Sequence, residues 1–181
     1  MNNMFLNIIT PCSRKENLKT ISECINIPTD RYKWYVVFDS ENIPDSIPDN
    51  CIPYAVKVDG SISGNGQRNH ALDLITSGYV YFNDDDTIIH PDFWEAVKDC
   101  TEDFISFKQV NKDGSLRLYG DNISRNNIDS HNILLTRELI GDVRWVLHEY
   151  GADGIFAEDC YRKASTKLYI PKVLSTYNSL R

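Results

Sequence analysis

The amino-acid sequence predicts a single α/β domain, and two observations support this class. Segments of strand-forming residues alternate with segments whose apolar residues recur at helical spacing. Acidic residues also follow directly after predicted strands, as at Phe38-Asp39 and Phe82-Asn83-Asp84. Ligands of open α/β sheets bind outside the carboxyl ends of the strands, so these carboxylates predict a binding site at that edge.

Length and composition limit the classes of protein that the chain can be. Its 181 residues, 41% of them hydrophobic, are enough for one globular domain with a sizeable core. The net charge of −7 argues against nucleic-acid binding and against docking on an anionic membrane. The five cysteines include no Cys-x-x-Cys pair, so neither a zinc pattern nor a disulfide framework is visible. With no signal peptide and no integral membrane segment visible, we expect a cytoplasmic protein.

The N-terminal third predicts strands and one helix. Pro11 is expected to end the first strand, because proline cannot donate to a central ladder. Ser13 and Glu16 have the spacing of a capping box for the helix that follows. The predicted strands cover residues 5–10, 32–38 and 54–58.

A second helix is predicted over residues 67–76, after the flexible tip Gly64-Asn65-Gly66. Arg68 lies in its first turn, where a cation is unfavourable for the helix dipole. We therefore expect an anionic partner for Arg68, either a ligand phosphate or a nearby aspartate.

Three consecutive aspartates, Asp84, Asp85 and Asp86, follow a predicted buried strand over residues 79–82. Adjacent carboxylates repel one another, so a positive charge must offset them, and a divalent metal is the simplest candidate. On this segment alone, a solvated acidic turn that begins the next helix fits equally well. An EF-hand loop is excluded, because Ile89 stands where its sharp turn needs glycine.

The C-terminal half predicts more strands, a cleft wall and a helix. Residues 142–155 have no clear period and many polar and aromatic side chains, so we interpret them as a loop-rich wall of a binding cleft. The helix after it is expected to begin at Ala157, with Glu158 and Asp159 in its first turn. His131 and His148 are open between a ligand contact and a structural role, with the structural role favoured. Strands are predicted over residues 103–110, 115–119, 131–136 and 167–177, the last broken by Pro171.

In this order the parts resemble a GT-A glycosyltransferase of the family 2 kind. The resemblance spans most of the chain, and the helix with Arg68-Asn69 leading into Phe82-Asn83-Asp84 is its most specific part. It implies one GT-A (Rossmann-like) domain over residues 1–181, with a mostly parallel mixed sheet flanked by helices. Residues 1–90 would form the nucleotide-binding half and residues 91–181 the acceptor-binding half. The matching residues are Thr10-Pro11, Asp39, Arg68-Asn69-His70-Ala71-Leu72, Asp84-Asp85-Asp86, Pro91-Asp92 and Glu158-Asp159.

The resemblance also implies an activity. It implies a metal-dependent inverting glycosyltransferase of the hexosyl or deoxyhexosyl type, with Mn²⁺ or Mg²⁺ as cofactor. The donor would be a nucleoside-diphosphate sugar, and the acceptor a glycan or another hydroxyl compound. Asp159 would be the general base, with Asp153 and Glu158 as substitutes. The donor would contact Thr10, Pro11, Arg14, Asp39, Arg68, Asp84 and Asp85; the metal Asp84 and Asp86; and the acceptor Trp145 and Asp153.

Two other classes are weaker. A nucleotidyltransferase acting on sugar phosphates also uses paired aspartates. It would usually have a glycine-rich loop after the first strand, but residues 11–15 contain no glycine. A receiver-like phospho-acceptor domain would have an acidic pair directly after the first strand, where this chain has Thr10-Pro11. The chain also departs from the resemblance, because it is short and has Phe38-Asp39-Ser40 in place of a double aspartate.

Overall fold

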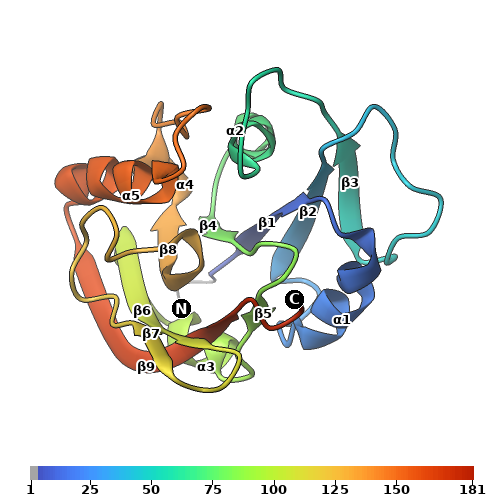
Figure 1. Cartoon of the computed structure of the whole chain (residues 1–181). Helices are drawn as coiled ribbons and strands as arrows, with labels where there is room; N and C mark the ends of the chain where they lie inside the picture. The colour runs from blue at the N-terminus through green and yellow to red at the C-terminus, as the bar shows by residue number, and fades with distance from the viewer. Residues whose placement is uncertain (1–3) are drawn as a thin grey trace.

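The computed structural model describes residues 4–181. Its centre is one curled sheet in which the strands lie in the order β3-β2-β1-β4-β8-β6-β9-β5, with β7 paired to β6 (Figure 1). The strands are β1 (Leu6–Cys12), β2 (Tyr32–Phe38), β3 (Cys51–Ala55), β4 (Tyr79–Phe82), β5 (Ile88–Ile89), β6 (Phe104–Asn111), β7 (Leu116–Leu118), β8 (Ile133–Thr136) and β9 (Lys167–Tyr177). The helices are η1 (Lys15–Asn17), α1 (Leu18–Cys24), α2 (Asn65–Leu74), α3 (Phe93–Val97), η2 (Ser130–Asn132), α4 (Arg137–Ile140) and α5 (Ala152–Lys163).

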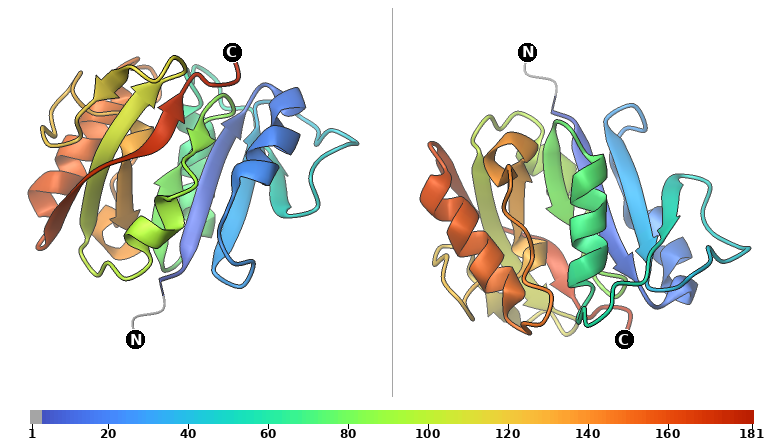
Figure 2. Two further views of the ribbon diagram at one scale, coloured as in Figure 1. Left: turned by 90° about the horizontal axis from the view of Figure 1, so that it is seen from below. Right: turned by 90° about the horizontal axis from the view of Figure 1, so that it is seen from above.

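Helices cover both faces of the sheet and form two hydrophobic cores. Figure 2 shows α1 and α3 on one face and α2, α4 and α5 on the other. The first core packs Leu18 and Phe93 against the sheet, and the second packs Leu72 and Phe156 against the opposite face. Both faces of β4 are therefore buried, which confirms that this strand is central and fixes the position of the three aspartates at its end.

The sheet confirms the α/β class but divides into two kinds of pairing. The strands β3, β2, β1 and β4 are parallel neighbours, so their carboxyl ends meet at one edge. Beyond β4 the sheet is mixed, because β8 runs antiparallel to both β4 and β6. The parallel half therefore positions the nucleotide-side residues predicted above. No helix within residues 4–181 is long and apolar enough to cross a bilayer.

Pro11 does not end β1, which continues to Cys12. The carbonyl of Cys12 accepts from the N–H of Asp39 at 3.2 Å, so the backbone polar groups of Cys12 point toward β2. Those of successive strand residues point to opposite sides, so the nitrogen of Pro11 points toward β4. Pairing with β4 stops at Ile9, and the missing N–H of Pro11 leaves no ladder bond unmade. The third strand also lies earlier than predicted, and Pro53 fits inside it because β3 is at the edge of the sheet.

Helix α5 begins at Ala152, five residues before the predicted start, and this changes the site. The segment was predicted to be a loop because it has no clear period and many polar and aromatic side chains. Gly154 is required inside the helix, because a Cβ there would lie 2.8 Å from the Cα of Arg125. The first turn of α5 therefore contains Asp153, while Asp159 lies well inside the helix.

Candidate functional site

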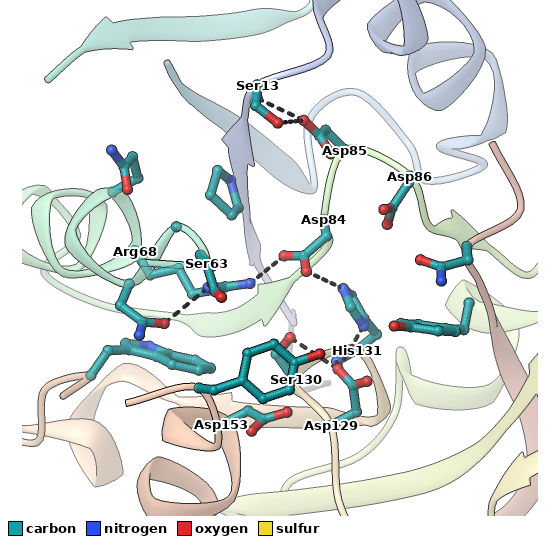
Figure 3. Close-up of a pocket in the computed structure, with 18 of the residues that line it drawn as sticks. Ser13, Ser63, Arg68, Asp84, Asp85, Asp86, Asp129, Ser130, His131 and Asp153 are labelled. Atoms are coloured by element: carbon teal, nitrogen blue, oxygen red, sulfur yellow. Dashed lines mark hydrogen bonds and ion pairs between the residues drawn. The ribbon is translucent and has the colours of Figure 1, made fainter. Parts of the chain in front are cut away.

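A cavity of about 540 Å³ opens at the carboxyl ends of the parallel strands (Figure 3). It is lined by the turns after β1, β2 and β4, by the start of α2, by the segment before β8, by the start of α5 and by the end of β9. Thr10 and Asp159 lie outside its lining. The predicted site residues that line it are Pro11, Arg14, Asp39, Arg68, Asp84, Asp85, Asp86, Trp145 and Asp153.

Asp84 lies between two cationic groups. One carboxylate oxygen pairs with the guanidinium of Arg68, and the other lies 3.1 Å from Nε2 of His131 (Figure 3). Burial opposes the charge of Asp84, but Arg68 and His131 lower its pKa to about 2. The anionic partner expected for Arg68 is therefore an aspartate of the cluster.

Asp85 holds the turn after β1. Its Oδ2 accepts from the backbone N–H of Ser13 at 2.6 Å and of Arg14 at 2.7 Å, and Arg14 Nη1 lies 2.5 Å from its Oδ1. The Ser13 hydroxyl donates to the same carboxylate, so the predicted capping box is wrong and residues 15–17 form a 3₁₀ turn. These contacts use several acceptor positions of the carboxylate, so Asp85 holds the turn in this structure, and its contact with a nucleotide stays a prediction.

Asp86 is paired with two arginines. Its Oδ2 accepts from Arg181 Nε at 2.6 Å and from Arg14 Nη1 at 3.2 Å. The backbone N–H of Leu180 also donates to the Asp86 carbonyl at 3.1 Å, which holds the end of β9 against the cluster. Arginines and a histidine thus offset the three carboxylates, which is the role that the sequence assigned to a metal.

The donor set nevertheless fits a cation that a diphosphate shares. No three His, Cys, Asp or Glu side chains in the part of the chain that the structure describes are grouped to hold a metal ion. Mg²⁺ and Mn²⁺ are, however, commonly held by one or two carboxylates together with substrate phosphates. Asp84 and Asp86 offer such carboxylates, both on the cavity wall.

A buried chain of charges behind Asp84 could not be expected from sequence. Nδ1 of His131 lies 2.7 Å from Asp129, and the other oxygen of Asp129 lies 2.6 Å from Arg117. Arg117 in turn lies over the ring of Tyr177, 3.7 Å from its centroid. Burial opposes the positive charge of His131, but Asp129 and Asp84 raise its pKa to about 10. The one local sequence feature that relates to this chain of charges is the spacing of Asp129 and Asn132, which form the capping box of η2.

Asp153 points into the cavity and carries no ion pair. It lies in the first turn of α5, half-buried, and makes no salt bridge with any residue from 4 to 181. Burial and the charge of Asp129 raise its pKa, so this carboxyl holds a proton more tightly than an exposed aspartic acid.

Asp159, the general base predicted from sequence, is on a different face of α5. Six residues rotate a helix by about 600°, so Asp159 is turned roughly 240° from Asp153. Its side chain is 42% exposed and lies 3.2 Å from Arg162 on the same helix. The structure therefore places Asp159 outside the residues that line the cavity, whereas Asp153 of the same helix lies among them. Its neighbour Glu158 accepts a hydrogen bond from the backbone of Arg125 at 2.6 Å.

Thr10 and Trp145, predicted to contact the donor and the acceptor, are both buried in the structure. Thr10 is fully buried, and its hydroxyl accepts from Trp34 Nε1 at 2.9 Å, so it belongs to the core. Trp145 is 3% exposed, with Phe156 stacked on its ring and the guanidinium of Arg68 over it. Its ring lies under the Arg68 guanidinium at the base of the cavity and exposes little surface for an acceptor.

Strained backbone gathers around the same cavity. Within residues 4–181, the non-glycine residues with positive φ are Ser63, Asn126 and Asn178, with φ of 52°, 73° and 49°. All three line the cavity. Such conformations cost about 1–3 kcal/mol each and cluster at functional sites.

Comparisons with known proteins identify the fold. No family model matches the chain, and no curated protein matches it by sequence. Among solved structures, residues 1–349 of S. aureus TarS give a TM-score of 0.76 at 15% identity, covering 96% of this chain and 60% of that one. The mannosyltransferase PcManGT from Pyrobaculum calidifontis, solved with GDP-Man and Mn²⁺, gives 0.69 at 14% identity, covering 98% and 58%.

The chain has a GT-A glycosyltransferase fold. This GT-A domain spans about 60% of the TarS structure, which was also solved with UDP-GlcNAc and with UDP. At this level of identity the likeness establishes the fold alone.

Proposed function

We propose that the cavity binds a nucleoside-diphosphate sugar and transfers the sugar to an acceptor hydroxyl. One observation carries this proposal: a cluster of arginines and aspartates and a separate, unpaired carboxyl line the same cavity. The cluster suits an anionic donor, and the unpaired Asp153 suits an acceptor whose proton must be removed.

On the donor side, Arg14 and Arg181 are placed to bind a diphosphate. Both contact Asp86, and their side chains are 34% and 54% exposed, so each can exchange a carboxylate for a phosphate oxygen. Arg68 is buried beside Asp84 and is fixed in place. Asp39 lies at the end of β2 on the same wall, where it can accept from a base or a ribose.

A divalent cation, Mn²⁺ or Mg²⁺, would be held by Asp86 and Asp84 together with the diphosphate and would neutralise the leaving group's charge. When the cation binds, Arg181 would move away from the Oδ2 of Asp86, because the cation and the guanidinium repel each other. PcManGT was solved with GDP-Man and Mn²⁺, which supports this choice of cofactor.

On the acceptor side, Asp153 would act as general base. Its carboxylate takes the hydroxyl proton as the acceptor oxygen forms a bond to C1 of the sugar. The bond from C1 to the diphosphate breaks, and the diphosphate leaves with the electron pair. A single displacement of this kind inverts the anomeric centre. Residues 1–90 would thus bind most of the donor, and residues 91–181 would supply the acceptor side and the base.

The test is ligand-dependent stability. The melting temperature should be measured with UDP-GlcNAc, GDP-Man and a TDP sugar, each with and without Mn²⁺. At a hundredfold excess over Kd we expect a rise of about 5 °C or more for one nucleotide. The rise should disappear in Asp86→Ala and persist in Asp159→Ala. If no nucleotide shifts the melting temperature of the unmodified protein, the proposed function is wrong.

A further inference from the structure

Tyr150 is the most exposed large hydrophobic side chain that the structure describes, at 86%. It nevertheless lines the cavity, three residues before Asp153. The aromatic rings of the core, such as Trp145 and Phe156, are 3% and 1% exposed. Single exposed hydrophobic side chains are common on protein surfaces, and the feature that sets Tyr150 apart is its place in the cavity lining.

The loop that carries Tyr150 is fixed on both sides. The side-chain amide of Asn65 donates to the carbonyl of Val146 at 2.9 Å and to that of Glu149 at 3.2 Å. The carboxylate of Glu149 accepts from Arg125 at 2.8 Å. The backbone before Tyr150 is thus attached to α2 and to the segment that precedes η2.

Gly151 fixes the backbone on the C-terminal side of Tyr150. A Cβ at this position would lie 3.0 Å from Nε of Arg125, so the guanidinium packs directly on the backbone that leads into α5. The exposure of Tyr150 is therefore a property of an anchored segment. A rigid aromatic side chain offers contact area at a low cost in conformational entropy.

We infer that Tyr150 is the acceptor platform, and that the acceptor presents a pyranose ring. A pyranose has apolar C–H faces that pack on an aromatic ring and hydroxyls at its edge, one of which can reach Asp153. Trp145, the residue that the sequence favoured for this contact, is covered by Phe156 and Arg68. This inference rests on the proposed function, because it names the acceptor class of the same cavity.

The experiment is saturation-transfer NMR with the protein, Mn²⁺ and the nucleotide diphosphate that stabilises it. The probes are the methyl pyranosides of glucose, galactose, mannose and N-acetylglucosamine, with sorbitol and mannitol as acyclic controls. We expect at least one pyranoside to bind, and neither alditol. Its Kd should rise about tenfold in Tyr150→Ala and stay within about twofold in Tyr150→Phe.

Tyr119→Ala is the matched control. Tyr119 is 58% exposed but lies outside the cavity, so its removal should leave pyranoside binding unchanged. The inference is overturned if no pyranoside binds, if the alditols bind equally well, or if Tyr150→Ala binds as the unmodified protein does. Nucleotide-dependent stabilisation is measured in the same samples, so failure of the platform and failure of the proposed function can be told apart.

Discussion

Two groups of carboxylates on the cavity wall differ in their partners. Asp84, Asp85 and Asp86 follow one central strand, and each is paired with arginine or histidine. Asp153 lies across the cavity on α5 with no salt bridge to any described residue. The pKa of Asp84 is lowered to about 2, whereas the pKa of Asp153 is raised.

This difference in partners and in pKa indicates different roles for the aspartate cluster and for Asp153. A carboxylate held ionised by cations at a low pKa is suited to hold structure and to share cations with a ligand, but it is a poor proton acceptor. A partly buried carboxyl with a raised pKa is suited to take a proton from a hydroxyl. The paired region should therefore dominate stability, and the unpaired region should dominate the rate of transfer.

The largest effect on stability is expected for His131→Gln. This change removes the positive charge between Asp84 and Asp129 and leaves the buried Asp129 and the half-buried Asp84 each short of a partner. We expect a loss of about 3–5 kcal/mol in the free energy of unfolding, measured by urea denaturation. The control is His148→Gln. Its ring is exposed and Nδ1 lies 2.5 Å from the carbonyl oxygen of Gly60, so this change should cost less than about 1.5 kcal/mol. Equal losses in the two variants would contradict the importance of the paired region.

A smaller loss is expected for Gly154→Ala in α5. Alanine normally stabilises a helix interior by about 1 kcal/mol relative to glycine. Here the new Cβ would lie 2.8 Å from the Cα of Arg125, so we expect a destabilisation of about 1–3 kcal/mol by thermal or urea unfolding. Asp159→Ala, in the same helix and partly exposed, should change stability by less than about 1 kcal/mol. A stabilised Gly154→Ala protein would show that the 123–128 segment is not packed on α5 as described.

The smallest effect is expected for Arg181→Gln. Its side chain is 54% exposed, and the buried Asp86 keeps its contact with Arg14, so stability should change by only about 1 kcal/mol. Without nucleotide, Mn²⁺ should bind about two- to fivefold more tightly, because one competing cation has been removed. Binding can be followed by electron paramagnetic resonance, with Arg162→Gln as the control outside the cavity. Weaker Mn²⁺ binding would mean that Arg181 helps to assemble the cation site.

The sequence predicted the side of the cavity that we propose for the donor better than the side that we propose for the acceptor. Asp84–Asp86 and Arg68 were placed correctly, because strand patterning and helix electrostatics are local properties of the chain. The partners of those aspartates were missed, since His131 and Arg181 come from segments far away in sequence.

The start of α5 was missed for a different reason. Gly151 and Gly154 lower helix propensity, and only the packing of Arg125 explains why glycine is needed there. The predicted base at Asp159 came from the Glu158-Asp159 pair that the resemblance implied, and the earlier start of α5 is what places Asp153 in the first turn of the helix. The burial of Thr10 and Trp145 likewise depends on tertiary packing that a single sequence does not display.

The most direct measurement compares sugar transfer by Asp153→Asn and Asp159→Asn, using the donor and acceptor that the unmodified protein accepts. We predict that Asp153→Asn lowers the rate by about 10²–10⁴-fold with nucleotide affinity unchanged, and that Asp159→Asn stays within about twofold. In the unmodified protein the rate should rise with pH through an ionisation above the ordinary aspartate pKa of 3.8, and Asp153→Asn should lose this dependence. Full activity in Asp153→Asn, or a large loss in Asp159→Asn, would contradict the assignment of the unpaired carboxyl as the base.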